Sequence, residues 1–484
     1  MFLNLHEAGG QNKFYYLTEQ MKNRYFFTSR YTNDIYQFIV DACAKDLKIS
    51  KSNGYKNLEI KELKLLRKLN FKFLFFILIQ FLKGKFFSKR KITKLKYKYI
   101  NVGQYLTAMT ARNYATYQSS FSYYVELFKN IIRICYRIET ANYYLKNYKF
   151  SGVYVDHAMY LNGVLFDIFF ANKKIIYSNQ HPQSLFKIIP QKNKDANFLN
   201  YLKIKYDNKN LSQTEKIGTK RLIKKLFFNP KKYIAYMQDT PLKKFNKKFD
   251  KRLLKSFEYI VYSHAVTDAQ LLCGIDGFAS ILDWQIFTIE QLIKENKKFI
   301  VKAHPSFHMK GKMFLWERKI FSSLMNRYKK HQDILFIEEP IENLEVVKNL
   351  NPKCIILTHH GTAELEGIYH NLKVISFKNN IYDHKYEISN KWSNIEEYKS
   401  LLKRNWSKLE YANYDNYLKL MNKYYVKGPY FGKHFYLNVL QDHMIKNKVI
   451  NKNFNNIENM IKIFNKSKNK KKIIKNLNIR IQEM

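Results

Sequence analysis

Apolar residues recur along this chain in short runs that are separated by longer amphipathic stretches. Within residues 251–391, five runs have the length of strands: Glu258–Tyr262, Lys298–Lys302, Ile334–Ile337, Lys353–Leu357 and Lys373–Phe377. The segments between them have helical periodicity: Trp284–Glu295, Met313–Tyr328, Ile341–Asn349 and Thr362–Asn371. Strands and helices that alternate in this way form a parallel sheet with helices on both faces. The pattern therefore predicts a five-stranded, doubly wound α/β domain.

The preceding region, residues 96–250, repeats this alternation less regularly. The predicted strands are Tyr97–Leu106, which includes a turn, Gly152–His157 and Lys174–Ser178. The predicted helices are Tyr123–Leu145 and Gly163–Ala171. A second Rossmann-like domain is expected here, in which the lysine-rich and irregular segment Tyr201–Asp250 serves as a connecting region. Residues 1–95 are predicted to be a mostly helical extension, and residues 392–484 to be helices that end in a basic tail.

The longest apolar run, Phe73–Leu82, lies inside the predicted N-terminal extension. It is too short to span a bilayer, which requires about 20 residues. Lysines precede and follow it, at Lys68, Lys72, Lys83 and Lys85. Two alternatives remain open: a buried helix, or an interfacial segment whose lysines meet lipid headgroups. The first residues of the chain have neither a basic start nor a long apolar stretch, so no signal peptide is expected.

The composition adds a strong positive charge to this picture. The chain has 85 Lys and Arg residues against 39 Asp and Glu, a formal net charge of +46. It lacks zinc-finger spacing, RNP-type aromatic motifs and helix-turn-helix signals, so no specific nucleic-acid partner is expected. An anionic membrane surface is the favoured partner, and a coding bias toward Lys, Asn, Ile, Tyr and Phe is the alternative explanation. The four cysteines form no CxxC pair, as expected of a protein in a reducing cytoplasm.

Chemically versatile residues stand where the predicted strands of residues 251–391 end. The segment His360-Gly361-Thr362 follows one strand and opens a helix. Gly361 permits close backbone approach, Thr362 can cap the helix or donate to a phosphate, and helix N-termini bind anions. Carboxyl ends of parallel strands meet at one edge of the sheet, where ligands bind. The segment therefore predicts a site for a phosphorylated ligand, with an ordinary capped turn as the alternative.

Two neighbouring motifs extend the predicted site. His304 follows another strand and could donate to a phosphoryl oxygen of a leaving nucleotide, while Pro305 fixes the turn that aims it. Glu366 lies one helical turn beyond Thr362, where its carboxylate could hold the hydroxyls of a ribose. A solvated surface acid is the alternative for Glu366, and Glu364 is expected to be structural.

Three further side chains, Asp156, His157 and Asp268, are candidates for catalysis, and His264 is a further candidate for binding the donor nucleotide. His264 and Asp268 follow the first strand of the same domain and would face the same cleft, with Asp268 as a base or as the group that orients one. Asp156 and His157 end a strand of the first domain and could supply the base that deprotonates an acceptor hydroxyl. Helix capping and a polar strand end without chemistry are the respective alternatives.

Several of these segments together resemble a known family. VYVDHAMYLNG, YSHAVTDAQ, LDW, VKAHPS and THHGTAELEGIYHNLKVISF resemble bacterial capsule and surface-polysaccharide biosynthesis proteins. Those proteins are similar to glycosyltransferases of the B fold (GT-B), including capsular Kdo transferases and bacterial sialyltransferases. The resemblance covers roughly residues 150–390. It implies two Rossmann-like domains that face each other across a cleft.

The same resemblance implies a function. A sugar would pass from a nucleotide-activated donor to a capsular or lipid-linked glycan acceptor, without a metal or cofactor, at the inner face of the cell membrane. His304 and Pro305 would bind the donor nucleotide, and Gly361, Thr362 and Glu366 its phosphate and ribose. The CMP-sugar enzymes carry two acids before a glycine as catalytic base, whereas this chain has Ile275-Asp276-Gly277. The resemblance therefore does not specify a CMP-linked donor.

Two other functions remain open at this point. One is transfer of a polyol phosphate from a CDP-activated donor, a reaction that also uses histidines at strand ends. The other is a basic scaffold or export factor of the polysaccharide machinery that keeps the fold without the activity.

Overall fold

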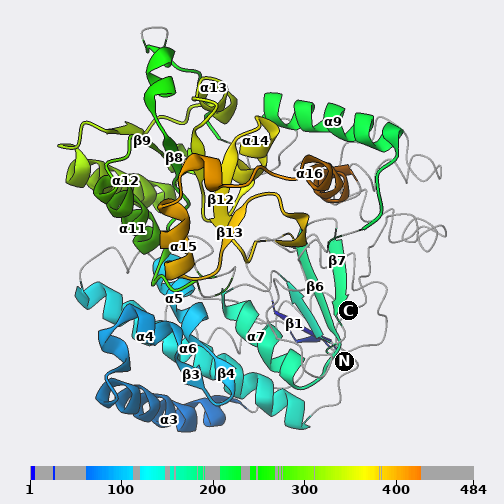
Figure 1. The fold of residues 1–484 in the computed structure, drawn as a ribbon. Helices are drawn as coiled ribbons and strands as arrows, with labels where there is room; N and C mark the ends of the chain where they lie inside the picture. The colour runs from blue at the N-terminus through cyan, green and yellow to red at the C-terminus, as the bar shows by residue number, and fades with distance from the viewer. Residues whose placement is uncertain are drawn as a thin grey trace, which may run out of the picture.

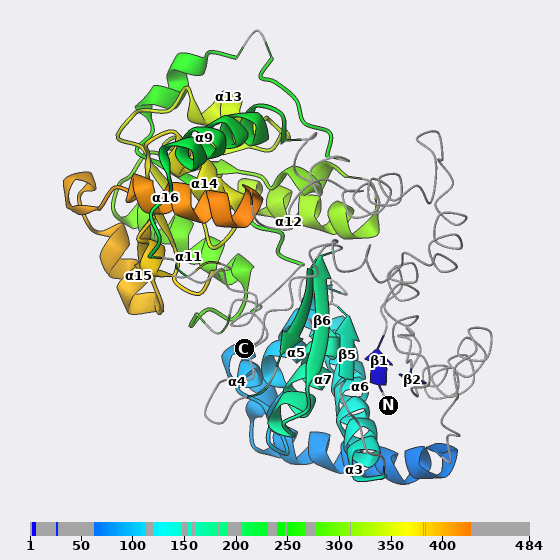
Figure 2. The ribbon, with the colours of Figure 1, turned by 90° about the vertical axis from the view of Figure 1, so that its right-hand side faces the viewer.

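The chain folds around two separate β-sheets, which define an upper and a lower unit in Figures 1 and 2. The structure is a computed structural model. It describes residues 2–5, 26–27, 62–112, 120–147, 153–156, 160–181, 184–188, 190, 206, 208–230, 240–246, 249–267, 271, 274, 276–309, 311–380, 382 and 384–426.

The upper unit contains a six-stranded, fully parallel sheet. Its strands are β8 (Tyr259–Tyr262), β9 (Phe299–Lys302), β10 (Ile334–Ile337), β11 (Ile355–Leu357), β12 (Lys373–Phe377) and β13 (Asn390–Trp392). Their order in the sheet is β10-β9-β8-β11-β12-β13. Numbered along the chain this is 3-2-1-4-5-6, the Rossmann order. The predicted α/β class and all five predicted strands are confirmed, and β13 adds a sixth where the tail was expected to become helical.

Helices cover both faces of this sheet. Successive strand residues point to opposite sides, and because the residues on both sides are apolar, both faces have to be buried. Ile260, Ile300 and Ile356 face one hydrophobic core, and Val261 and Val301 face the other. The helices are α11 (Ile281–Lys294), α12 (Lys312–Tyr328), α13 (Asn343–Val347), α14 (Thr362–Tyr369), α15 (Ile395–Leu402) and α16 (Tyr414–Met421). The first four match the predicted helices, with differences of a few residues at their ends.

One further helix, α9 (Gln213–Phe228), lies in the segment that was expected to be an irregular connection. That expectation was wrong. Ser212 and Glu215 form a capping box at its start, the sequence signal that the lysine-rich composition obscured. Leu226 and Phe227 belong to a core of the upper unit, and Asn422 donates to Thr219 at 2.9 Å. Packing against α16 and the residue that follows it therefore stabilises α9.

The lower unit has a five-stranded sheet in the order β2-β1-β5-β6-β7. Its strands are β1 (Phe2–Leu5), β2 (Phe26–Phe27), β5 (Val153–Asp156), β6 (Ile176–His181) and β7 (Ser184–Ile188). Only the β6–β7 pair is antiparallel. The extension predicted to be mostly helical supplies β1 and β2 as well as α3 and α4, and these two short strands were not predicted. Strand β1 has only four residues, too few to show the alternation of apolar and polar positions that marks a strand. It pairs with β5, which is far away in sequence.

Helices stack beside this sheet in successive layers. They are α3 (Glu62–Leu82), α4 (Lys89–Thr93), α5 (Gly103–Arg112), α6 (Ser120–Asn147) and α7 (Tyr160–Ala171). The predicted strand over residues 97–106 is instead a short hairpin, β3 (Lys96–Tyr97) and β4 (Ile100–Asn101), followed by α5. Helix α7 contacts β5 and β6, α6 contacts α7, and α3 contacts α6. Helix α3 is thus the outermost layer, along the lower edge of Figure 2.

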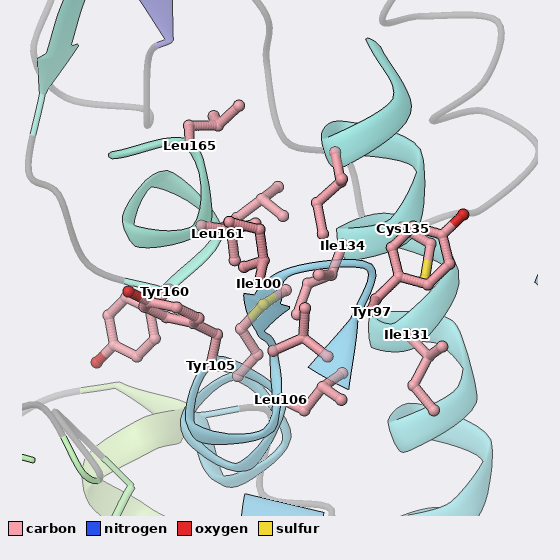
Figure 3. Close-up of a cluster of buried hydrophobic side chains, with 14 of the residues drawn as sticks. Tyr97, Ile100, Tyr105, Leu106, Ile131, Ile134, Cys135, Tyr160, Leu161 and Leu165 are labelled. Atoms are coloured by element: carbon pink, nitrogen blue, oxygen red, sulfur yellow. The ribbon is translucent and has the colours of Figure 1, made fainter. Parts of the chain in front are cut away.

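The core of the lower unit is formed where α5, α6 and α7 converge. Figure 3 shows Tyr105, Ile134 and Leu161 from these helices pointing toward one another. Among the described residues of this unit, Asp167 is the one buried carboxyl group, and it accepts a hydrogen bond from the Tyr105 hydroxyl at 2.8 Å. Its Oδ1 atom has no hydrogen-bond partner among the described residues. Burial raises the pKa of Asp167 from 3.8 to about 8.

This raised pKa predicts that the free energy of unfolding falls as pH rises. Between the two pKa values the folded chain keeps a proton on Asp167 that the unfolded chain has lost, so stability decreases by roughly 1.4 kcal/mol per pH unit. Asp167→Asn mimics the protonated acid, and this decrease should be absent. Urea unfolding followed by far-UV circular dichroism at pH 5 and pH 8 measures the difference.

Asp415→Asn is the matched control for that experiment. Asp415 pairs with Lys216 at the surface, which lowers its pKa, so it stays ionised in both states between pH 5 and 8. Its pH dependence should equal that of the wild type. Equal pH dependence of Asp167→Asn and the wild type would contradict the assignment of a protonated Asp167.

Candidate functional site

Three histidines meet at the carboxyl ends of the central strands of the upper unit. His264 follows β8, His304 follows β9 and His360 follows β11. The ring centroid of His264 lies 5.9 Å from that of His304 and 4.0 Å from that of His360. The structure therefore brings together three residues that the sequence placed at separate strand ends.

This position is the topological switch point of the sheet. From β8 the chain moves outward through β9 to β10, and then returns to the other side of β8 to form β11, β12 and β13. The loops after β8 and β11 consequently diverge toward opposite faces, which leaves a crevice between them. Ligands of open α/β sheets bind in that crevice.

The local environment keeps two of these imidazoles neutral. Burial, with smaller contributions from His264 and Lys302, lowers the pKa of His304 from 6.5 to about 3. Burial, with smaller contributions from His264 and His359, holds the pKa of His360 well below its usual value. A neutral imidazole offers one N–H donor and one acceptor nitrogen. Among the described residues, no group of three or more His, Cys, Asp or Glu side chains is arranged to hold a metal ion.

A chain of hydrogen bonds fixes the orientation of His360. Asp276 Oδ2 lies 2.5 Å from His359 Nε2, and His359 Nδ1 lies 2.6 Å from His360 Nδ1. A carboxylate only accepts, so His359 carries its proton on Nε2. If His359 holds only that proton, its Nδ1 accepts the Nδ1–H of His360. Nε2 of His360 is then left as a hydrogen-bond acceptor.

Neither Asp276 nor His359 was predicted to belong to the site. His359 is almost fully buried, and its ring lies 5.5 Å from Trp284, 5.0 Å from Phe377 and 5.5 Å from Trp392 between centroids. These rings exclude water and strengthen the hydrogen bonds inside. The acid before Gly277 and the doubled histidine were visible in the sequence, but their pairing across 83 residues was not.

Glu366 and Lys302 form a second polar group beside the histidines. Burial raises the pKa of Glu366 to about 7 and lowers that of Lys302 to about 8, and each charge partly offsets the effect on the other. Asn343 donates to Glu366 Oε2 at 2.7 Å, and the Tyr262 hydroxyl donates to Asn343 at 2.5 Å. Glu366 is half-buried within this network and is not the solvated surface acid of the alternative interpretation.

The predicted glycine turn takes a conformation that suits an anion site. Gly361 is the N-cap of α14, with φ of 132°, and provides no side-chain cap. Thr362 is the first helical residue and Gly361 is the N-cap, so of the two roles open to Thr362 the structure does not support helix capping. Glu364 is fully buried and pairs with Lys391 at 2.7 Å, which confirms its structural role. Pro305 begins a short 3-10 helix directly after His304.

A buried carboxylate that the sequence did not reveal holds the loop of His264. Glu317 of α12 accepts the backbone N–H groups of Val266 at 3.0 Å and Thr267 at 2.7 Å, and also the Thr267 hydroxyl. Glu317 is fully buried. Because Val266 and Thr267 stand two and three positions after His264, Glu317 fixes the backbone of that side of the crevice.

The remaining predicted catalytic residues stay predictions. The backbone of Asp156 ends β5, opposite Asn179 of β6, which agrees with the predicted strand end. The Asp156 side chain lies outside the described part of the structure, as do His157 and Asp268.

The two units meet close to this hydrogen-bonded chain. A cavity of about 330 Å³ is lined by Ser88 and Arg90 of the lower unit and by Phe278, Ala279, Asp283 and Phe287 of the upper unit. The Phe278 backbone N–H donates to Asp276 Oδ1 at 2.8 Å. The segment that orients the histidines therefore also faces the lower unit.

Comparison with known proteins finds only distant structural similarity. No protein-family profile matches the chain, and no curated protein sequence matches it. A structure of Methanocaldococcus jannaschii UDP-GlcNAc 2-epimerase in complex with UDP-GlcNAc and UDP is 12% identical, covers 66% of this chain and 96% of its own, and has a TM-score of 0.26. A second structure of UDP-GlcNAc 2-epimerase from Methanocaldococcus jannaschii is 13% identical, covers 87% and 99%, and has a TM-score of 0.24. Similarity at this level does not assign the chain to a family, because unrelated functions share α/β folds.

Proposed function

We propose that this chain is a metal-independent glycosyltransferase of GT-B type that acts on a capsular or other cell-surface glycan. The donor is a nucleotide sugar and the acceptor is a polysaccharide or a lipid-linked glycan. One observation carries the proposal: the histidines of three adjacent strand ends converge at the switch point of a Rossmann-ordered sheet, beside the N-terminus of α14.

The donor phosphates would lie at the first turn of α14. N–H groups and the helix dipole favour an anion there, and a glycine N-cap leaves the approach open. A Cβ atom built on Gly361 would meet no atom of the described residues within 4 Å, so they leave the space in front of the turn open. Glu366, one turn along the helix, would accept from the ribose hydroxyls.

The histidines would act on the bond that breaks. In the transfer, the bond between the anomeric carbon and the phosphate oxygen breaks, and its electron pair moves onto the phosphate. A neutral His304 can donate N–H to that oxygen as charge develops, without the repulsion or desolvation that a buried imidazolium would bring. Nε2 of His360 can accept from a hydroxyl of the donor.

The acceptor hydroxyl would approach from the lower unit. Its oxygen bonds to the anomeric carbon while its proton passes to a base, for which Asp156, His157 and Asp268 are the candidates. Because the cavity between the units lies beside Phe278, an acceptor bound there would be close to the proposed donor site.

A panel of nucleotides and nucleotide sugars tests the proposal. Binding of CMP, CDP, UDP and GDP is measured by calorimetry, and release of nucleotide from the corresponding sugars by chromatography. We expect one base to bind selectively and its sugar to give slow release that a glycan acceptor accelerates. Release of CMP from a CDP-polyol indicates the phosphotransferase alternative. A chain that binds none of them acts as a scaffold, and the proposal fails.

Replacing Gly361 by alanine should weaken nucleotide binding at least tenfold. The added methyl group would occupy the open space before α14, and a φ of 132° strains any residue other than glycine by about 1–3 kcal/mol. Calorimetric titration with the selected nucleotide, together with the unfolding midpoint, separates the two effects.

Gly218→Ala is the matched control. A Cβ atom at Gly218 also meets nothing within 4 Å, but this residue lies inside α9, where alanine is favoured over glycine by about 1 kcal/mol. Nucleotide binding should be unchanged and the chain slightly more stable. Unchanged binding by the Gly361 variant would place the phosphates elsewhere.

A further inference from the structure

One face of α3 exposes large apolar side chains in a continuous stripe. The exposed residues, with 45% to 75% of each accessible, are Leu74, Phe75, Leu78, Phe81 and Leu82. With 3.6 residues per turn they fall within an arc of roughly 120°. Soluble proteins rarely leave such a contiguous patch in water unless it binds something.

The opposite face of α3 is firmly attached to the lower unit. Phe73 is buried, and the Tyr97 ring lies 6.3 Å from the Phe73 ring and 5.0 Å from the Phe76 ring, both edge to face. Lys72 pairs with Glu139 at 3.1 Å. The outward direction of the stripe is therefore set by packing, on the layer farthest from the β-sheet of the lower unit.

The segment that contains the stripe is strongly cationic. Residues 63–112 contain thirteen Lys and Arg residues and no Asp or Glu. Lys83 is exposed at the end of the stripe, and Lys91 and Lys94 are exposed on and just after α4. In the described part of the chain, no helix is long and apolar enough to cross a bilayer. An apolar stripe with a basic border is the pattern of a helix that lies in a membrane interface.

We propose that this face of α3 docks the protein onto an anionic lipid bilayer. Helix α3 lies parallel to the membrane plane, its five apolar side chains enter the boundary between headgroups and acyl chains, and the lysines contact lipid phosphates. Charge favours a lipid bilayer over a second copy of the chain as the partner of this face. Two such faces would each carry the same excess of cations and would repel each other.

Docking would hold the lower unit, which supplies one wall of the cavity between the units, at the membrane. Arg90, which lines that cavity, follows the last residue of α3 by eight positions. A lipid-linked acceptor could therefore reach the cavity from the bilayer surface. That consequence rests on the proposed function, whereas lipid binding by α3 does not.

Vesicle sedimentation of the full chain tests the docking surface. The vesicles are phosphatidylcholine with or without phosphatidylglycerol, and the probe variant is F75E/L78E, which adds two carboxylates to the stripe. We expect the wild type to bind vesicles that contain phosphatidylglycerol, with affinity that falls as salt rises. The variant should bind at least tenfold more weakly.

The double variant I217E/L315E is the matched control. Ile217 on α9 and Leu315 on α12 are similarly exposed apolar residues of the upper unit, and their replacement adds the same two carboxylates. This control should bind as the wild type does, since net charge changes equally in both variants. Nucleotide binding should be the same in all three proteins, which keeps a failure here distinct from a failure of the proposed transferase.

Three outcomes would overturn the proposal. The first is a wild type that does not bind vesicles containing phosphatidylglycerol. The second is equal loss of binding in both double variants, which would show a general charge effect. The third is a dimer in solution that F75E/L78E converts to a monomer, because the stripe would then be an interface between copies.

Discussion

Replacing His304 by alanine is expected to reduce donor-dependent release of nucleotide by about 10²–10³-fold while the chain remains folded. The reason is the position of this imidazole at the carboxyl end of β9, next to His264 and close to the N-terminus of α14. Removing it takes away a donor placed where charge would develop on the leaving phosphate. Release is measured at saturating nucleotide sugar, with circular dichroism as the check on folding.

The protonation state of His304 gives this prediction a second signature. With a pKa of about 3, His304 is neutral over the whole physiological range and donates as an uncharged N–H group. The pH profile of kcat/KM, which reports groups of the free enzyme, should therefore show no loss of activity from His304 as pH rises through 6.5. His304→Gln keeps a neutral N–H donor and should restore part of the activity.

His331→Ala is the matched control for the His304 variants. His331 is exposed in the loop between α12 and β10, and its replacement should leave both release and folding unchanged. If His304→Ala retained wild-type release, or if kcat/KM fell with rising pH near 6.5 and lost that dependence in His304→Gln, the assigned role would be refuted.

Replacing Asp276 by asparagine is expected to weaken donor binding and turnover by about 10- to 100-fold, although Asp276 would not touch the donor itself. Asp276 Oδ1 accepts the N–H of Phe278, so an asparagine keeps its oxygen there and turns its NH₂ group toward His359 Nε2. His359 must then carry its proton on Nδ1 and donate to His360. This reverses the tautomer of His360, and Nε2 changes from an acceptor into a donor.

Nitrogen chemical shifts of the labelled histidines report that reversal directly. In the wild type, His360 should show a protonated Nδ1 and an unprotonated Nε2, and Asp276→Asn should exchange the two. Asp333→Asn is the control, because Asp333 is exposed at the surface of the upper unit, where it pairs with Lys298 at 3.8 Å. A variant that loses activity with unchanged tautomers would indicate that Asp276 has a structural role alone.

The upper unit was largely predictable because its strands are buried on both faces. A strand of a parallel sheet is apolar throughout, so β8, β9 and β12 appear in the sequence as short hydrophobic runs between amphipathic helices. The position of His304 and His360 at strand ends followed from the same pattern. Their convergence could be predicted from the rule that the carboxyl ends of parallel strands lie at one edge of the sheet.

Elements whose stability comes from distant contacts were not predictable. Strand β1 is four residues long and depends on pairing with β5 about 150 residues away. Helix α9 is lysine-rich and is held by α16, and the short hairpin β3–β4 packs against α3 through Tyr97 and Phe76. In each case local preference is weak and burial against another element decides the conformation.

By itself, the sequence determined the α/β class, the carboxyl-end location of the candidate site and the basic character of the segment around α3. All three depend on residues close together in the chain, through hydrophobic period and local charge. Only the tertiary structure decided that Asp276 and His359 orient His360, that Glu317 holds the loop of His264, and which face of α3 meets solvent. Those features are contacts between residues 50 or more positions apart, or directions in which side chains point, and a pattern of hydrophobic and polar positions does not encode either.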